Sequence, residues 1–183
     1  MNPFHKSYIT LFQQDLLLRG EYKNPHQVPK IEKVVLNIGM KDLLQDKKRI
    51  LIPLLALEAI TGQRTVTTKS RKMVANLKIR KGTLLGTKVT LRGASLYIFL
   101  TRLNLLLFPR LKQWRGFSKK DINHQGNLSF RLPKALDFLE LERHYALFPQ
   151  LPSIDITLVT SAKTKEEGQA LLTSFPFPFV TDK

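Results

Sequence analysis

Two segments of the chain alternate between apolar and polar residues, and this period of two limits the fold more than any other feature. The segments are 31–38, with Val34, Leu36 and Ile38 at alternate positions, and 87–92, with Val89 and Leu91. Because successive side chains of a β-strand point to opposite faces, the alternation predicts strands that bury one face only. A sheet covered on one face has its second face free to bind a partner.

The order of the predicted elements favours an α+β fold. We predict helices over 6–19, 46–60, 94–108 and 165–175, and strands over 30–39, 64–68, 87–93, 128–132 and 154–161. The last helix opens with a capping-box pattern, Thr164 followed by Glu167. Several strands follow one another without a helix between them, which favours a mainly antiparallel sheet with helices packed on one face over a doubly wound parallel sheet. We expect a single domain, residues 1–183, with an N-terminal helical segment, 1–22.

The basic residues are concentrated in one part of the chain. No aspartate or glutamate occurs between Glu58 and Asp121, an interval that holds fifteen of the 30 Lys and Arg residues, and the formal net charge of the whole chain is +16. The densest part is a long basic loop, predicted over 69–86. Concentrated charge of one sign destabilises a compact protein by self-repulsion, so we expect a polyanionic partner. Nucleic acid, an anionic membrane surface and an acidic protein all meet this requirement.

The residues argue against most catalytic and metal-binding classes. The chain has no cysteine, which removes disulfides, thiolate metal sites and cysteine nucleophiles. The four histidines lack the spacing of metal ligands, and GTLLGTK at 82–88 lacks the residue order of a phosphate loop. We therefore predict no cofactor, no metal and no enzymatic activity. A serine-based triad stays open, because triads assemble from distant parts of a chain.

A membrane partner is not predicted. No apolar run reaches the roughly 20 residues of a membrane helix, since Pro53, Glu58 and Arg102 interrupt the two longest runs. A peripheral membrane protein should have one basic amphipathic helix, whereas here the charge lies on a loop, a strand face and short connections. The first twenty-one residues carry as many acidic as basic side chains, which is untypical of a transit peptide. We expect either that a presequence has been removed or that the protein is made where it works.

An ordered series of motifs extends through most of the chain. The series includes VPKIEKVVLNIG, ITGQ, TKSRKMVANLKIRKGTLLGTKVTLRG, FPRLKQWRGFS, DITLVTSAKTKEEGQALL and FPFPF. It resembles, from about Val28 to Val180, the large-subunit ribosomal protein L-five family of bacterial and organellar type, whose members bind the small 5S ribosomal RNA. The resemblance implies a curved sheet with helices on one side. It also implies a structural protein of the central protuberance of the large subunit.

The resemblance further implies an RNA-binding face. The residues at the family's LN-G, GQ and TLRG positions are expected to contact 5S RNA, together with a lysine of the same cationic row. They are Asn37, Gln63, Lys88, Thr90 and Arg92. An amide can donate and accept toward base edges or 2′-hydroxyls, and a guanidinium can bind a phosphate with two hydrogen bonds. The alternatives are that Gln63 caps a helix end and that Thr90 only pairs across the sheet.

The basic loop matches the family segment that reaches transfer RNA in the peptidyl site. Its contact residues are expected to be Lys69, Arg71, Lys72, Asn76, Lys78, Arg80 and Lys81. Such a contact relies on charge and reads no bases, because the peptidyl site must accept every transfer RNA whatever its sequence. The alternative is a static clamp on ribosomal RNA.

Further partners implied by the resemblance are large-subunit ribosomal RNA, neighbouring proteins of the central protuberance and a small-subunit head protein across the subunit bridge. The sequence departs from the bacterial pattern between 127 and 155, so contacts made there by relatives do not carry over. This divergence and the leucine-rich runs at 50–57 and 103–108 favour a mitochondrial ribosome. A plastid ribosome and the bacterial cytoplasm are the alternatives. On charge alone, another basic RNA-binding protein or a nucleic-acid enzyme stays open.

Overall fold

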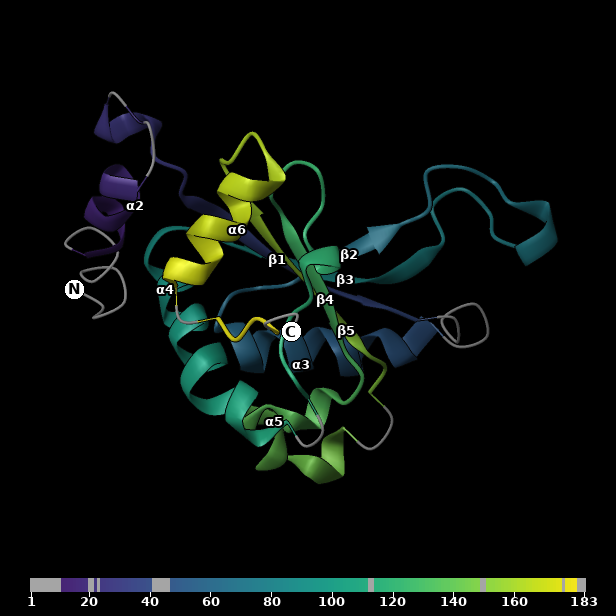
Figure 1. Ribbon diagram of the computed structural model, residues 1–183. Coiled ribbons are helices and arrows are strands. Elements are labelled where there is room, and N and C mark those ends of the chain that lie inside the picture. The colour runs from purple at the N-terminus through teal and green to yellow at the C-terminus, as the bar shows by residue number, and fades with distance from the viewer. Residues whose placement is uncertain are drawn as a thin grey trace. The chain divides into compact units, whose positions relative to one another are not determined.

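The computed structural model describes residues 11–19, 22, 24–40, 47–111, 114–148, 151–175 and 177–180 (Figure 1). The chain forms two compact units. Unit 1 comprises residues 1–34, 91–130 and 157–183, and unit 2 comprises residues 35–90 and 131–156. All four boundaries between the units fall inside strands. Each unit is therefore assembled from segments that are distant in the sequence.

Five strands form one sheet, in the order β2-β3-β1-β5-β4. They are β1 (Ile31–Gly39), β2 (Val66–Lys69), β3 (Leu84–Leu91), β4 (Leu128–Leu132) and β5 (Ile154–Thr160). β2 and β3 pair antiparallel. The end of β1 is bonded to the start of β3, from Met40 N to Leu85 O at 3.0 Å, and the end of β5 to the start of β1, from Ser161 N to Lys30 O at 2.9 Å. An antiparallel sheet with helices is the α+β fold that the sequence predicts.

Burial along β1 and β3 confirms the alternation in the sequence. Alternate positions are buried: Val34, Leu36 and Ile38 of β1, all 0% exposed, and Thr87, Val89 and Leu91 of β3. The residues between them are half-buried or exposed, and the other buried residues of the two strands are Ile31 and Gly86. One face of each strand is therefore core, and the other face carries the polar residues.

Unit 1 contains the helices α2 (Gln13–Arg19), α4 (Gly93–Arg102) and α6 (Lys165–Ser174). α4 continues as a π-helical turn, Leu103–Leu107, and a 3-10 turn, Phe108–Arg110. This confirms the helix predicted over 94–108. Of the helix predicted over 6–19, residues 6–10 lie outside the described residues. No helix in the described part of the chain is both long and apolar enough to cross a membrane.

The start of α6 is capped as the sequence predicts. Thr164 Oγ1 accepts a hydrogen bond from Glu167 N at 3.3 Å, and Glu167 Oε2 accepts one from Lys163 N at 2.9 Å. The first bond satisfies an orphan donor of the helix, as the capping-box pattern predicts. The second goes to the residue before the N-cap and not to Thr164 N, so the reciprocal bond of a capping box is displaced by one residue.

Gly168 in α6 packs directly on Gly126, which precedes β4. A Cβ atom on Gly168 would lie 2.5 Å from the carbonyl oxygen of Gly126. The same carbonyl accepts a hydrogen bond from Thr160 Oγ1 at 3.0 Å. Glycine inside a helix costs about 1 kcal/mol relative to alanine, and here the close backbone contact explains why it is tolerated.

An aromatic cluster fills another part of unit 1. Its members are Phe108, Trp114, Phe117, Phe130, Phe177 and Phe179. The backbone of Phe117 bonds to the C-terminal segment on both sides, donating to Pro178 O at 2.8 Å and accepting from Val180 N at 2.9 Å. The motifs WRGF and FPFPF therefore meet although about sixty residues separate them.

Unit 2 contains α3 (Leu51–Thr61) and the short α5 (Leu139–Glu142), which contact each other. The helix predicted from residue 46 begins as α-helix only at Leu51, after a 3-10 turn, and Asp46 lies outside the described residues. Pro53 is tolerated because it lies in the first turn, where its missing N–H has no partner to lose. Sequence analysis missed α5, because a single helical turn is too short to show a 3.6-residue period.

Short 3-10 turns complete the structure. They are Pro25–Gln27, Lys47–Ile50, Ala75–Leu77, Phe108–Arg110, Lys119–Asp121, Ala135–Asp137 and Tyr145–Leu147.

Candidate nucleic-acid interface

The open face of β1 and β3 in unit 2 brings together three of the residues that the sequence singles out. Asn37 alternates with the buried residues of β1, and Lys88 and Thr90 alternate with those of β3. Lys88 is exposed, whereas Asn37 and Thr90 are half-buried. Because β1 and β3 are neighbours in the sheet, an amide, a hydroxyl and an ammonium group emerge on one face. We call this set, with Gln63, the strand face.

Gly86 allows β1 and β3 to approach closely at this face. A Cβ atom on Gly86 would collide with the carbonyl oxygen of Ile38 and lie 3.1 Å from Gly39 Cα. The prediction that residue 86 belongs to the basic loop is wrong. β2 and β3 pair as far as Lys69 and Leu84, so residues 84–86 are part of the sheet. The alternation of apolar and polar residues begins only at residue 87, because Leu84, Leu85 and Gly86 do not continue it. The pattern therefore could not reveal that β3 begins three residues earlier.

Gln63 is positioned by the end of α3. Gly62 ends the helix in the left-handed conformation (φ 67°), and its N–H donates to Glu58 O at 2.8 Å. The exposed Gln63 side chain donates from Nε2 to Thr90 O at 3.2 Å. Pairing between β2 and β3 stops at Lys88, so the amide satisfies a strand edge that lacks a neighbour. Gln63 therefore does not cap a helix end.

The Gln63 bond leaves the side chain of Thr90 available. It uses the backbone oxygen of Thr90, and the Thr90 hydroxyl has no hydrogen-bond partner within the described residues. One amide hydrogen and the amide oxygen of Gln63 also stay available at the surface. Both residues can therefore hold the sheet edge and contact a ligand at once.

Arg92 follows β3 directly, in unit 1, as the extended N-cap residue of α4 (φ −141°). Its side chain is exposed, as is that of Lys88 in unit 2. Neither forms an ion pair with any carboxylate of the described ranges. Both positive charges are therefore available to an external anion.

The parts of β4 and β5 that belong to unit 2 show the opposite arrangement. Arg131 is paired with Asp155, with 2.6 Å from Nε to Oδ1 and 3.3 Å from Nη2 to Oδ2. The hydrogen bond and the charge of Asp155 raise the pKa of Arg131 above its usual value. This guanidinium is already neutralised by a fork-shaped pair. The excess positive charge of the sheet strands therefore lies on β2 and β3, at Lys69 and Lys88.

The connection between β2 and β3, residues 70–83, is a hydrogen-bonded hairpin (Figure 1). Its base is closed by Ser70 N donating to Thr83 O at 2.8 Å, and Val74 and Ile79 exchange two bonds of 3.0 and 3.1 Å near the tip. Lys78 closes the tip in the left-handed conformation (φ 52°). We call residues 70–83 the basic hairpin. Its backbone has its own ladder, which residue composition alone did not indicate.

The basic hairpin buries almost nothing. The predicted contact residues Lys69, Arg71, Lys72, Asn76, Lys78, Arg80 and Lys81 are all exposed. Sequence reasoning attended to charge and missed the apolar residues between them: Met73 is 71% exposed and Leu77 is 60% exposed. A partner of the hairpin therefore meets both charge and apolar surface.

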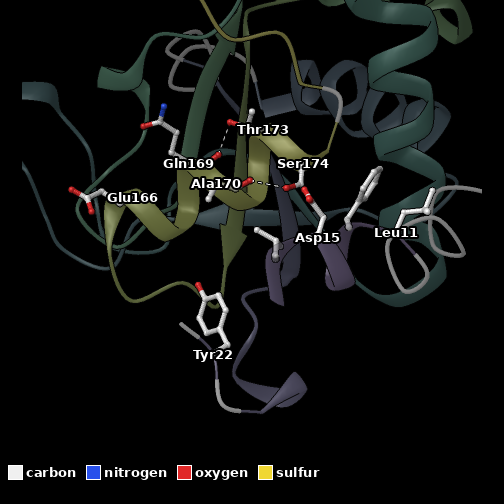
Figure 2. A pocket seen from close by; sticks show the side chains of 10 residues that line it. Leu11, Asp15, Tyr22, Glu166, Gln169, Ala170, Thr173 and Ser174 are labelled. Atoms are coloured by element: carbon white, nitrogen blue, oxygen red, sulfur yellow. Dashed lines mark hydrogen bonds between the residues drawn. The ribbon is translucent and has the colours of Figure 1, made fainter. Parts of the chain in front are cut away.

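A hollow of about 740 Å³ lies between α2 and α6 in unit 1 (Figure 2). Its charged lining residues, Asp15 and Glu166, are both acidic. The hydroxyls of Thr173 and Ser174 donate to backbone oxygens one turn earlier, at 2.7 and 3.0 Å. Negative charge makes this hollow unsuited to a phosphate. Nor does any cluster of three His, Asp or Glu side chains occur in the described segments to hold a metal.

Comparison with known proteins gives consistent matches to both units. The family model described as "Ribosomal protein L5" matches residues 24–80, and a second model, which describes the C-terminus of the same ribosomal protein family, matches residues 84–179. The first match ends at residue 80, within the basic hairpin, and the second begins at residue 84, directly after it.

Three relatives that match over nearly the whole chain carry the name of the same ribosomal protein. The large ribosomal subunit protein uL5m of Reclinomonas americana is 42% identical over 178 residues, which is 97% of this chain and 98% of the relative. The uL5 protein of Desulforamulus reducens is 43% identical over 173 residues, 94% of each chain. The uL5 protein of Colwellia psychrerythraea is 41% identical over 179 residues, 98% of each chain.

Proposed function

Because the chain belongs to the ribosomal protein L5 family, we propose that it binds 5S ribosomal RNA through the strand face and Arg92. Family membership makes the chain a structural, non-enzymatic component of the large ribosomal subunit. The observation that carries the proposal is Lys88 beside the hydroxyl of Thr90, both without a polar side-chain partner in the part of the chain that the structure describes.

The chemistry of the strand face suits RNA more than DNA. Asn37 and Gln63 offer amides, and Thr90 offers a hydroxyl, each of which can donate to or accept from a 2′-hydroxyl. Lys88 and Arg92 supply charge for the phosphates. Because the side chains of β1 and β3 stand on a close-packed pair of strands, the groups are held at fixed spacing, as recognition of a folded RNA requires.

The basic hairpin contacts transfer RNA in the peptidyl site in our proposal. Its charges are exposed, uncompensated within the hairpin and carried by a backbone with its own hydrogen bonds. Charge without base readout suits a ligand whose sequence varies. The exposed Met73 and Leu77 favour a second candidate, a static clamp on ribosomal RNA, because apolar surface is best used in a contact that excludes water permanently.

Further proposed partners are large-subunit ribosomal RNA, neighbouring proteins of the central protuberance and a small-subunit head protein across the subunit bridge. We propose a mitochondrial ribosome as the location. A mitochondrial relative matches over nearly the whole chain, and two bacterial relatives match as well, so the similarity does not discriminate. Mass spectrometry of ribosomes purified from isolated organelles and from the remaining extract would decide the compartment.

Binding of the isolated protein to 5S RNA at graded salt concentrations tests the main proposal. We expect log affinity to fall linearly with log salt, by about 0.7 to 0.9 per phosphate neutralised. A 5S RNA with scrambled sequence serves as the control for specificity. Equal affinity for the two RNAs, or a flat salt dependence, would contradict the proposal.

A further inference from the structure

The hollow between α2 and α6 in unit 1 is bounded by two segments that contact each other through the core. Phe12, directly before α2, contacts Phe175, directly after α6, with ring centroids 5.2 Å apart. Phe175 is 0% exposed, and Leu16 of α2 is 3% exposed. These contacts hold the walls of the hollow. Its volume of about 740 Å³ lies within the range of ligand sites, about 300–1,000 Å³.

Part of the lining of this hollow is apolar and exposed. Leu11 is 62% exposed, Ala170 of α6 is exposed, and Phe12 is half-buried. Single exposed leucines are normal on a protein surface, but apolar side chains that gather in one hollow indicate a contact surface. A partner that brings apolar side chains of its own would cover them.

The polar groups of the hollow mainly accept hydrogen bonds. The charged lining residues in the described part of the chain are two carboxylates from different helices, Asp15 of α2 and Glu166 of α6 (Figure 2). The carboxylate of Glu166 has no ion pair or hydrogen bond within the described residues. The hydroxyls of Thr173 and Ser174 already donate to backbone oxygens, so they can only accept from a partner. A cation that carries several donors fits this set.

An arginine or lysine side chain meets both requirements. Its charged end carries only donors, and its aliphatic stem can lie on apolar surface. RNA does not fit, because carboxylates repel phosphates and the described residues that line the hollow include no lysine, arginine or histidine. Charge complementarity therefore selects a protein segment with basic and apolar residues.

We propose that the hollow between α2 and α6 binds a segment of a neighbouring protein in which arginine or lysine stands among apolar residues. Asp15 and Glu166 attract the cation, and Leu11 and Ala170 contact the apolar residues. The inference deepens the proposed contacts with neighbouring proteins of the central protuberance and rests on that proposed function. The chain then uses positive surface for RNA and negative surface for protein.

A labelled, capped hexapeptide of leucine and arginine tests the hollow in the isolated protein. We expect saturable binding by fluorescence anisotropy, and weaker binding of the same peptide with glutamine in place of arginine. The formal net charge of +16 opposes nonspecific attraction of the arginine peptide, so its binding reports local carboxylates. Absence of saturable binding, or equal binding of the glutamine peptide, overturns the inference.

Glu166→Gln should lower affinity for the arginine peptide about two- to fivefold, the range of an exposed ion pair. The fold should persist, because Glu166 is exposed. Glu32→Gln makes the same change at an exposed position of unit 1 outside the hollow, and it should leave the affinity unchanged. If the two variants behave alike, the peptide responds to total charge and the inference fails.

Leu11→Ala tests the apolar part of the hollow. Leu18→Ala is the matched control, because Leu18 is 88% exposed and does not line the hollow. Leu11→Ala should lower affinity for the arginine peptide more than Leu18→Ala does, since it removes apolar area from the contact. Equal affinities of the two variants would contradict the proposed apolar contact.

Cross-linking in assembled subunits tests the nature of the partner. The chain has no cysteine, so Ala170→Cys provides a single thiol in the hollow for a benzophenone maleimide. Gln125→Cys provides one at an exposed position of unit 1 outside the hollow. In purified large subunits, the label at residue 170 should cross-link to a protein segment that contains arginine or lysine, and the label at residue 125 should not reach that segment. A cross-link to RNA, a cross-link to residues 1–10 of the same chain, or no cross-link overturns the inference.

Binding of 5S RNA distinguishes this inference from the main proposal. Glu166→Gln should retain 5S RNA affinity, and Arg92→Ala should retain affinity for the arginine peptide. If wild-type protein binds the peptide but not 5S RNA, the main proposal fails and the hollow remains a protein-binding site. If wild-type protein binds 5S RNA but not the peptide, this inference alone fails.

Discussion

The strand face and the basic hairpin are neighbours in the sequence and are both cationic, yet they are built differently. On the strand face, Asn37, Lys88 and Thr90 alternate with buried residues, and Gly86 brings two backbones into contact. In the hairpin, the backbone is bonded only to itself, and residues 71–78 are all exposed. In our proposal, charge of one sign therefore serves two purposes: recognition of a fixed RNA shape, and contact with an RNA whose sequence varies.

Gly86→Ala should produce the largest effect on 5S RNA binding. The added methyl group meets the backbone of Ile38 and not a flexible side chain, so β1 and β3 must separate. We expect a loss of about 3 kcal/mol of unfolding free energy, the upper end for overpacking, together with loss of binding. Urea unfolding and RNA binding measure the two effects.

Gly39→Ala is the matched control, because a Cβ atom there meets nothing within 4 Å. It should change stability by less than about 1 kcal/mol. If the two alanine variants behave alike, close strand contact does not explain Gly86.

Arg92→Ala should have the next largest effect. Loss of a charge-assisted contact is expected to weaken 5S RNA binding by about 1 to 3 kcal/mol and to reduce the salt slope by about one. The fold should persist, since Arg92 is exposed. Filter binding at several salt concentrations gives both values.

The double variant Arg131→Ala, Asp155→Ala provides the comparison for Arg92→Ala. It removes a cation of the sheet that is already neutralised at 2.6 Å, so 5S RNA affinity should stay close to that of the wild type. A loss as large as that of Arg92→Ala would show that binding follows total charge and not position.

Gln63→Leu should have a smaller effect. It removes the donor to Thr90 O and leaves that strand edge unpaired. We expect about 1 kcal/mol of lost stability and a modest decrease in 5S RNA affinity, because Thr90 is less well positioned. Hydrogen exchange of the amides around residue 90 would detect the loosened edge. Unchanged exchange would indicate that the Gln63 bond does not hold the strand.

Replacing four hairpin cations and the adjacent Lys69 of β2 by serine should have the smallest effect on 5S RNA binding. The hairpin positions are Arg71, Lys72, Lys78 and Arg80. Exposed positions usually change stability by less than about 0.5 kcal/mol each, and 5S RNA content of purified large subunits should be unchanged. Affinity for transfer RNA in the peptidyl site should fall.

The same subunits test the alternative role of the hairpin. If the hairpin variant loses 5S RNA as severely as Arg92→Ala, the hairpin is a static clamp on ribosomal RNA. The two regions would then share one function.

Much of the strand face could be predicted from sequence, because a two-residue period is local. The alternation placed Lys88 and Thr90 on the polar side of β3, and the structure agrees. The partner of Gln63 could not be predicted, since Thr90 lies 27 residues away and the bond depends on where β2 stops pairing.

The sequence by itself determined the strands with one polar face, the capped start of α6 and the concentration of positive charge between Glu58 and Asp121. These features depend on residues within a few positions of one another, so periodicity and composition reveal them. Only the tertiary structure decided that Gly86 lies against β1 and that the Gln63 side chain donates to the backbone of Thr90. Such contacts join residues far apart in the chain, and they arise when strands pair and the core packs, which no local pattern encodes.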